Sequence, residues 1–310
     1  HPPLDFEVPA VIQWRLSPTV SDEATAQILS RNAQGATVPV HVEINTGLNR
    51  LGLDWQQASD VIARIAALPG PRIAGVFTHF RAAFSEGDGS VRQQMERFDR
   101  VMADLAARGI EPGLRHAASS IAMAFYPDTY LDGVRPGMMV YGGMKPVEPA
   151  HATPSSLLAL RPVMAARTRI IHVKSVAAGE WIHYGETFQA QRPMRAAVLP
   201  IGYGMGYSRH LSNNGEVLIG GRRVPIVGVI GMDMTVVDVT SLPSVAVGDV
   251  ATVLGRDGGD EITAVELAER IGTISYEITC RLGNALPRYV VGESVAEAAA
   301  PVGLVSTKRT

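Results

Sequence analysis

The stretch Val38-Pro39-Val40-His41-Val42-Glu43-Ile44 runs directly into the turn-forming residues Asn45-Thr46-Gly47. It is short, rich in β-branched residues and bounded by a turn, which predicts a β-strand. Apolar residues then recur at helical spacing across residues 61–68, and Pro69-Gly70-Pro71 predicts the end of that helix. Residues 73–80 predict a second buried strand. Strand, helix and strand with short connections indicate parallel strands joined by crossover helices.

This alternation continues to about residue 141. An apolar stripe across residues 91–105 predicts a helix closed by Gly109. Further strands are predicted for residues 8–13, 16–20, 114–117 and 134–141. The fold class is therefore predicted to be α/β, a TIM-type (β/α) barrel for which about six of eight strands are found. Six strands would leave two open edges with unpaired backbone groups. Either the N-terminal strands are missing from this chain or the barrel interpretation is wrong.

From about residue 155 the pattern changes to strands with little helix between them. The predicted strands cover residues 163–176, 196–201, 216–219, 224–229 and 234–239. Gly220-Gly221 is a hairpin turn signal, and only residues 263–271 look helical, with Thr263 as a cap. We predict two domains: residues 1–150 form a partial (β/α) barrel, and residues 151–310 form a mainly antiparallel β domain.

The composition is that of an ordinary globular protein, with 46% hydrophobic and 19% charged residues in 310. A net charge of −2 gives no electrostatic reason to bind nucleic acid or an anionic membrane. The sequence has no uninterrupted apolar run of about eighteen residues, so no membrane span is expected. Its single cysteine, Cys280, cannot form an internal disulfide, which predicts a cytoplasmic location.

Three segments carry a family resemblance. They are Gly133-Val134-Arg135-Pro136-Gly137, Trp181-Ile182-His183-Tyr184-Gly185 and Ser275-Tyr276-Glu277-Ile278-Thr279-Cys280. Together they resemble alanine racemases, two-domain enzymes that use pyridoxal 5'-phosphate (PLP) to invert the α-carbon of an amino acid. The resemblance implies interconversion of L- and D-alanine by two bases, which supplies D-alanine for cell-wall peptidoglycan. It also implies a homodimer in which the first domain binds PLP and the second carries the catalytic tyrosine into a shared site.

Tyr184 is the catalytic residue that the resemblance implies, although a tyrosine in a strand–turn context is more often structural. Its phenol, with a reference pKa near 10, would need nearby positive charge to act as a base near neutrality. Arg135 is the implied partner of the pyridine nitrogen of PLP, whereas taken alone it reads as a surface arginine before a proline turn. A guanidinium donates hydrogen bonds but does not give up a proton at neutral pH. It therefore leaves the pyridine nitrogen as an unprotonated acceptor, which limits side reactions.

The remaining site residues are also implied by the resemblance. Taken alone, His79 reads as a satisfied core histidine; in the family it belongs to the hydrogen-bond network between the arginine and the tyrosine. The predicted contacts of the cofactor are His79, His116, Ser120, Arg135, the backbone amides of Gly137 and Met138, and Tyr276. The predicted contacts of the substrate are Arg50, whose planar fork suits a carboxylate, together with Tyr203, Met232 and Asp233. No metal site is predicted.

Several residues depart from the family pattern. Glu43 stands where many members carry a carbamylated lysine, and we predict a direct Glu43–Arg50 ion pair. Ser119 replaces the usual asparagine, while Phe84 and Met205 replace common aspartates and lower the polarity of the entry corridor. Tyr276 favours alanine, because related serine racemases tend to carry asparagine there.

The family's PLP-bearing lysine lies in a segment of the type Val-Lys-Ala-Asn-Ala-Tyr-Gly-His-Gly, which this sequence does not contain. Its three lysines are Lys145, Lys174 and Lys308, and none is predicted to hold the cofactor. Three explanations are open: the chain is a fragment, the segment comes from another chain, or the homologue no longer racemises. The strand count favours the first, and the activity of this chain alone depends on which holds.

Three other functions are alternatives to alanine racemisation. A racemase of another small amino acid is the first alternative, and a catalytically impaired PLP-binding homologue is the second. A PLP decarboxylase of related architecture would need a cysteine–aspartate pair, and Cys280 has no neighbouring aspartate in such a motif.

Overall fold

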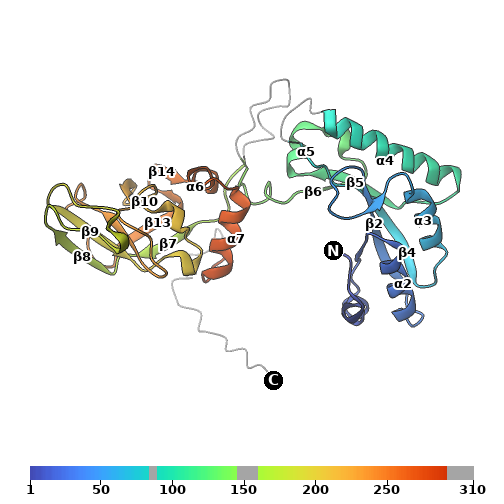
Figure 1. The fold of residues 1–310 in the computed structure, drawn as a ribbon, viewed down its shortest axis with the longest axis horizontal. Helices are drawn as coiled ribbons and strands as arrows, with labels where there is room; N and C mark the ends of the chain where they lie inside the picture. Colours follow the sequence, from blue (N-terminus) through green and yellow to red (C-terminus); the bar gives the residue numbers. More distant parts are fainter. Residues whose placement is uncertain (84–88, 145–159, 292–310) are drawn as a thin grey trace. The chain divides into compact units, whose positions relative to one another are not determined.

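The computed structural model describes residues 1–83, 89–144 and 160–291. The chain divides into two compact units, unit 1 (His1–Val163) and unit 2 (Met164–Thr310). Figure 1 shows helices and parallel strands in unit 1, coloured from blue to green, and mostly strands in unit 2, coloured from yellow to red.

Unit 1 contains a six-stranded sheet in which every pairing is parallel. Its main path runs through β1 (Thr19–Val20), β2 (Val38–Asn45), β4 (Pro71–Phe77), β5 (Leu114–Ser119) and β6 (Gly133–Arg135), with β3 (Leu53–Asp54) paired to β2. Neighbours along the path follow the order of the chain, and β1 and β6 are its ends within the described residues. Consecutive parallel strands need crossover connections, which the intervening helices supply.

The helices of unit 1 join these strands in turn and pack beside one another along the sheet (Figure 1). They are α2 (Glu23–Asn32), α3 (Ala58–Ala66), α4 (Gly89–Ala107) and α5 (Ser120–Phe125), with the short η2 (Pro127–Thr129) after α5. On β2, Val40, Val42 and Ile44 are buried in the core shared with α2, α3 and α4. Since side chains alternate along a strand, His41 and Glu43 project from the opposite face.

One predicted strand of unit 1 is a helix, and another is much shorter than predicted. Residues 8–13 form a helix, α1 (Val8–Gln13), after η1 (Asp5–Glu7). Pro9 stands in its first turn, and Val8 and Val11, three residues apart, are both buried. Residues 134–141 pair with β5 only as far as Arg135, because Pro136 has no amide hydrogen to donate and the chain then turns.

Unit 2 is built from two antiparallel sheets, as predicted. The larger one has the order β11-β10-β13-β14 with β7 paired to β13, and the smaller one is β12-β9-β8. The strands are β7 (Ala166–Arg169), β8 (His172–Val176), β9 (Met194–Leu199), β10 (Glu216–Ile219), β11 (Arg222–Pro225), β12 (Thr235–Asp238), β13 (Val250–Asp257) and β14 (Asp260–Ile262). Gly220 and Gly221 have φ angles of 58° and 75° and join β10 to β11, which confirms the predicted hairpin turn.

Other details of unit 2 differ from the prediction. The single strand expected over residues 163–176 is two strands, β7 and β8, that belong to different sheets. Helix α6 (Ala264–Ile271) is confirmed, and the Thr263 hydroxyl caps it by accepting the amide of Glu266 at 3.0 Å. Helix α7 (Ser275–Ala285) was not predicted; it buries Ile278 and Leu282, four residues apart.

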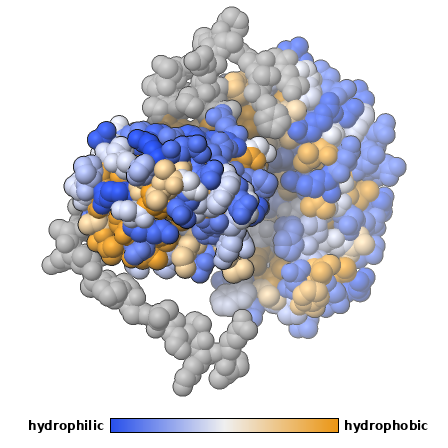
Figure 2. All heavy atoms as spheres, turned by 60° about the vertical axis from the view of Figure 1, so that its left-hand side comes forward, coloured by the Kyte–Doolittle hydropathy of each residue, from blue (hydrophilic) through white to orange (hydrophobic). Residues whose placement is uncertain are grey.

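Three short helical turns, η4 (Tyr184–Glu186), η5 (Tyr203–Met205) and η6 (Arg209–Leu211), complete unit 2. On the face drawn in Figure 2, polar residues predominate and apolar ones lie among them in small groups. No helix in the described part of the chain is long and apolar enough to cross a membrane. The predicted class, a parallel α/β unit followed by an antiparallel β domain, is confirmed.

Candidate active site

The predicted site residues of unit 1 gather where the parallel strands end. His79 follows β4, Ser120 follows β5 and Arg135 closes β6, and two residues that were not predicted, Asn45 and Thr78, lie at the same ends of β2 and β4. In (β/α) folds this carboxyl edge is where ligands bind, since the loops that follow the strands converge there.

Arg135 is the most heavily bonded side chain of this edge. One guanidinium nitrogen donates to Nδ1 of His116 at 2.6 Å. The other donates to the carbonyl oxygens of Thr78 at 2.9 Å and Ala117 at 3.0 Å, and lies 3.2 Å from Nδ1 of His79. The guanidinium also stands 5.1 Å from the centre of the Phe77 ring. These contacts therefore hold the guanidinium against β5 and against the residues at the end of β4.

A second hydrogen bond connects His116 to His41. Since arginine can only donate, Nδ1 of a neutral His116 must accept, and its proton lies on Nε2. Nε2 of His116 is 2.9 Å from Nδ1 of His41, so it donates to that nitrogen. A register shift between β2 and β4 brings Gly75 beside His41, where a Cβ atom would overlap the imidazole. Gly75 thus leaves the space in which His41 reaches His116.

Burial and positive charge keep these histidines neutral near pH 7. Burial lowers the pKa of His116 to about 4, with Arg135 and then His41 adding to the effect. Burial likewise lowers the pKa of His79 to about 4, with help from Arg135 and Arg50. The pKa of Arg135 falls to about 10, chiefly through burial, so its guanidinium remains charged at neutral pH.

A second group of donors surrounds Ser120, at the start of α5. Its hydroxyl oxygen accepts the amide hydrogens of Gly137 at 2.7 Å and Met139 at 3.3 Å, and the residue is only 2% exposed. The amide of Met138 has no hydrogen-bond partner among the described residues. Met139 had not been predicted here. A hydroxyl with converging amides and no carboxylate is a donor set suited to a phosphate.

Arg50 lies on the loop between β2 and β3. The Asn45 side chain shapes this loop by accepting the amides of Gly47 at 3.1 Å and Asn49 at 3.0 Å. Arg50 itself is exposed, as a side chain that receives a ligand from solvent would be.

The predicted Glu43–Arg50 ion pair is wrong. No ion pair joins these two residues in the described parts of the chain, although Arg50 is close enough to lower the pKa of Glu43. Burial has the larger effect and raises that pKa, since Glu43 is only 4% exposed. Gly52 lies against the buried Glu43 side chain, whereas Arg50 is exposed.

In unit 2, Tyr184 stands on a loop closed by the bridge between Trp181 and Gln189. Gly185 and Glu186 follow with φ angles of 75° and 49°, which makes the turn tight. The side chain of Asn213 braces the loop from outside: it donates to the Thr187 hydroxyl at 3.1 Å and accepts the amide of Gly228 at 2.6 Å. Tyr184 is 74% exposed and points out of the fold.

The other predicted substrate residues of unit 2 lie on two loops tied together through their backbones. The amide of Tyr203 donates to the carbonyl of Gly231 at 3.0 Å, and the amide of Gly204 to that of Met232 at 2.8 Å. Gly202 allows this approach, because a Cβ there would overlap the Gly231 and Met232 backbone. Tyr203 and Met232 are 44% and 62% exposed, and Asp233 beside them is exposed too.

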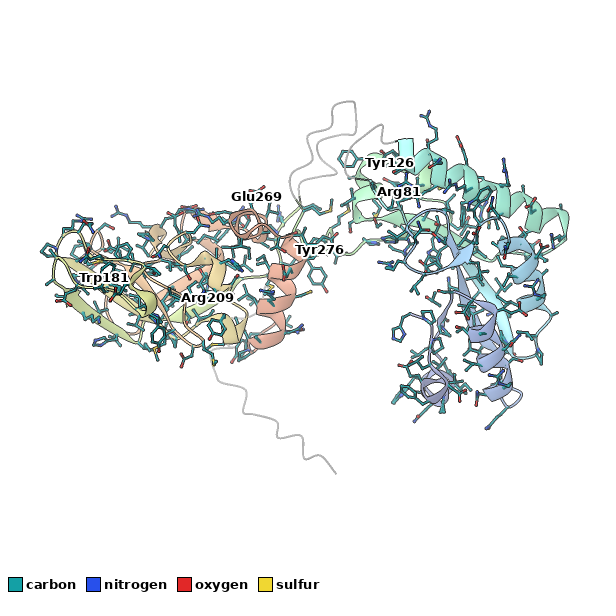
Figure 3. All side chains as sticks on the ribbon, viewed as in Figure 1. Arg81, Tyr126, Trp181, Arg209, Glu269 and Tyr276 are labelled. Carbon is teal, nitrogen blue, oxygen red and sulfur yellow. The ribbon has the colours of Figure 1, made fainter. Side chains whose placement is uncertain are left out.

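Tyr276, the remaining predicted phosphate contact, lies near the start of α7 in unit 2, as Figure 3 shows. Met205, in η5, packs partly against the core of unit 2. Lys174 is an exposed residue of β8, as predicted. Phe84, Lys145 and Lys308 lie outside the described residues.

Sequence reasoning missed His41 and Thr78. His41 stands two residues before Glu43, on the same face of β2, and alternation along the strand could have revealed it. Thr78 has no such signal: its hydroxyl donates to the Ile44 carbonyl at 2.9 Å and lies 2.7 Å from the Thr46 hydroxyl, which is a tertiary contact.

Comparisons with known proteins agree with this architecture. The family model "Alanine racemase, N-terminal domain" matches residues 3–145, and "Alanine racemase, C-terminal domain" matches residues 163–290. The chain is 38% identical to the alanine racemase of Nostoc sp., covering 91% of this chain and 73% of that protein. It is 40% identical to that of Symbiobacterium thermophilum, covering 92% and 75%.

Solved structures give the same result. An alanine racemase of Clostridium difficile is similar with a TM-score of 0.82 at 30% identity, covering 93% of this chain and 73% of that one. The alanine racemase of Streptomyces coelicolor is similar with a TM-score of 0.82 at 33% identity, covering 92% and 75%. Both domain models and relatives at this identity agree, and the chain belongs to the alanine racemase family of isomerases.

Proposed function

We propose that this protein is a PLP-dependent alanine racemase that interconverts L- and D-alanine by removing the α-proton on one face and returning it on the other. It would act in the cytoplasm and supply D-alanine for peptidoglycan. The observation that carries the proposal is Arg135, an inward-facing arginine whose bonds go to neutral histidines and backbone carbonyls rather than to a carboxylate.

The donors of unit 1 support PLP as the cofactor. Ser120 and the amides of Gly137 and Met138 would hold its phosphate, together with Tyr276, and Arg135 would face its pyridine nitrogen. When bound, PLP supplies the conjugated ring that stabilises the charge left on the α-carbon after proton removal. Within the described residues the amide of Met138 bonds to no acceptor, and such a donor in a buried residue supports a phosphate here.

Arg135 would limit the reaction to racemisation. A guanidinium has donors only, and its pKa of about 10 keeps it charged at neutral pH. It would therefore bond to the pyridine nitrogen without giving it a proton, which weakens the pull of the ring on electrons. The neutral His79 and His116 would serve as its acceptors and hold its plane, since neither carries a charge that would repel it.

Tyr184 would act as the base on one face of the substrate. Its phenol is exposed and free of hydrogen bonds among the described residues, so no existing bond must break before a substrate binds. Arg50 would bind the substrate carboxylate, and Tyr203, Met232 and Asp233 would line the substrate from unit 2. Removal and return of a proton by one positioned group is typically worth about 10²–10⁴ in rate.

The base on the second face would be the family's lysine, for which these 310 residues contain no matching segment. Borohydride reduction with PLP followed by peptide mapping tests this assignment. We expect no labelled peptide from this chain. Label on Lys174, which is exposed on β8, would contradict it.

The proposed enzyme is a homodimer in which Tyr184 of one subunit serves the partner's Arg135. Mixing Tyr184→Phe protein with Arg135→Gln protein tests this arrangement. Shared sites would regain activity, because some mixed dimers combine an intact tyrosine with an intact arginine. Activity no higher than the sum of the two separate variants would exclude sharing.

Exchange of the α-hydrogen in D₂O tests the function and the choice of substrate together. We expect the protein with PLP to exchange the α-hydrogen of at least one alanine enantiomer well above PLP alone, and faster than that of serine. Faster exchange of serine would favour the alternative, a racemase of another small amino acid. Binding of PLP without exchange of any amino acid would indicate a catalytically impaired homologue.

A further inference from the structure

His183, immediately before Tyr184, has a backbone conformation that is unusual for its residue type. Its φ and ψ angles are 64° and −161°. This region is populated almost only by glycine, because a Cβ atom there crowds the neighbouring backbone. A side chain that persists in such a conformation is held by its surroundings, and such strain often occurs at functional sites.

The imidazole of His183 lies in a slot formed by two glycines of the loop before β12. A Cβ at Gly231 would lie 3.0 Å from Cε1 and 3.3 Å from Nε2 of this ring. A Cβ at Gly228 would lie 3.1 Å from Cβ of His183 and 2.6 Å from the Ile182 carbonyl oxygen. These distances are tighter than ordinary contacts, so a side chain at either glycine would press on His183 or on the backbone before it.

The same imidazole is the neighbour of the Tyr184 ring. The two ring centres are 4.6 Å apart and the planes meet at 84°, an edge-to-face arrangement. Among the described residues, Tyr184 has no other ring contact and its hydroxyl has no hydrogen bond. Since Tyr184 is 74% exposed, little of its side chain is covered, and the ring of His183 lies against it.

Nδ1 of His183 is buried and has no hydrogen-bond partner within the described residues. Burial lowers the pKa of His183, while Asp233 on the facing loop opposes this effect. The other ionisable groups near it on its own loop are Tyr184 and Glu186. Since Nδ1 makes no hydrogen bond within the described residues, we infer that His183 acts on Tyr184 through the packing of its flat ring.

We propose that His183 is a positioning residue: its ring, held in the Gly228–Gly231 slot, fixes the direction in which the phenol of Tyr184 projects. The inference rests on the proposed role of Tyr184 as the base. Glycine at this position would satisfy the backbone but leave the phenol free to turn. The strained histidine instead presents one orientation of the phenol to the substrate, which is what proton transfer at a fixed carbon requires.

Three variants separate the ring from the strain. His183→Gly removes both, His183→Ala removes the ring but keeps the strain, and His183→Phe keeps both while deleting the unpaired nitrogen. Protein labelled with 3-fluorotyrosine reports on Tyr184 without cofactor or turnover. Its fluorine signal is assigned among the eight tyrosines by its loss in Tyr184→Phe, and the signal of the buried Tyr207 serves as a control for folding.

We expect the Tyr184 signal to move toward that of a free tyrosine and to sharpen in the glycine and alanine variants. In the phenylalanine variant it should stay near its original position with its original width, while the Tyr207 signal stays in place throughout. An unchanged Tyr184 signal in both the glycine and alanine variants would overturn the proposal.

Exchange kinetics with PLP then test the consequence. We expect His183→Gly to lower kcat for α-hydrogen exchange by about 10–10²-fold with KM nearly unchanged, because misplacement of a catalytic group acts on the transition state. His183→Phe should recover most of the loss. Unchanged exchange in the glycine variant would overturn the positioning role. If instead Tyr184→Phe exchanged at the full rate, the proposed function would fail, whereas the fluorine signals would still decide whether His183 fixes the phenol.

Discussion

Arg135 donates a hydrogen bond of 2.6 Å to Nδ1 of His116, and this bond sets the protonation of the residues behind it. Because the guanidinium only donates, His116 must carry its proton on Nε2, from which it donates a hydrogen bond to Nδ1 of His41 at 2.9 Å. The direction of donation therefore runs from the proposed cofactor contact into the sheet. Positive charge stays at Arg135, and the two histidines behind it are neutral: His116 accepts from Arg135 and donates to His41.

Replacing Arg135 by lysine should destabilise the protein by about 2–4 kcal/mol, because an ammonium cannot match acceptors placed for a planar fork. The four partners of Arg135 lie on β5 and on the residues that follow β4, and at least one buried acceptor would lose its donor. Urea unfolding measures the change. Arg256→Lys, on a 77% exposed side chain, is the control and should change stability by less than about 0.5 kcal/mol. Equal effects of the two substitutions would contradict this account of Arg135.

The stability of the protein should fall as the pH drops from about 6.5 to about 4. In the folded protein the pKa values of His79 and His116 are both about 4, against 6.5 in the unfolded chain. Above this pH range both histidines are neutral in the folded and in the unfolded chain, so they cause no loss of stability. Within it the unfolded state takes up protons that the folded state does not, which lowers the free energy of unfolding. Urea midpoints across this range, compared with those of His116→Asn, test the claim: the variant should show a shallower slope.

Gly75→Ala should break the His41–His116 contact. The added Cβ would lie 2.7 Å from the Leu114 carbonyl oxygen and would overlap the His41 ring, so either the strand or the imidazole must move. A loss of about 1–3 kcal/mol is typical of such overpacking. Gly133→Ala in the same sheet is the matched control, since a Cβ there meets nothing within 4 Å and its φ is not positive. Similar thermal unfolding of the two variants would show that the space beside Gly75 is not needed.

Glu43→Gln should leave stability near pH 7.5 unchanged or slightly raised. Burial raises the pKa of Glu43, so ionisation costs more in the folded protein than in the unfolded chain. A raised pKa means stability that is present at low pH and declines as the pH rises through the folded value. Glutamine removes this decline while keeping the shape of the side chain. If the glutamine variant is markedly less stable near pH 7.5, then the carboxylate has a bonding role that its contacts do not account for.

The sequence predicted the arrangement of elements better than the details that depend on tertiary contact. The strand at residues 38–44 and the change of pattern after residue 155 were readable, since alternation and turn residues are local signals. Residues 8–13 were misread because a six-residue apolar run suits a strand as well as a helix, and only Pro9 hinted at the latter. The Glu43–Arg50 pair failed because Arg50 lies on the loop after β2, and the spacing of the two residues does not fix where a loop side chain points.

In the candidate site, too, local motifs could be identified from the sequence whereas tertiary contacts could not. The motifs identified Arg135 and Ser120, which the structure brings to one edge of the sheet with His79 and His116. They could not indicate that His183 would adopt a glycine-like backbone, because that conformation depends on Gly228 and Gly231, some fifty residues further along. The sequence also gave no sign that the Met139 amide would join the Ser120 cluster.

The most direct test of the central claim compares wild-type protein with Tyr184→Phe in α-hydrogen exchange of L- and D-alanine, with PLP, in D₂O. The phenol is highly exposed and lacks hydrogen bonds in the described residues, so the substitution should leave the fold intact. We predict that wild-type protein exchanges at least one enantiomer and that the variant loses about 10²–10⁴ of that rate. Equal exchange by the two proteins would contradict the assignment of Tyr184 as the base.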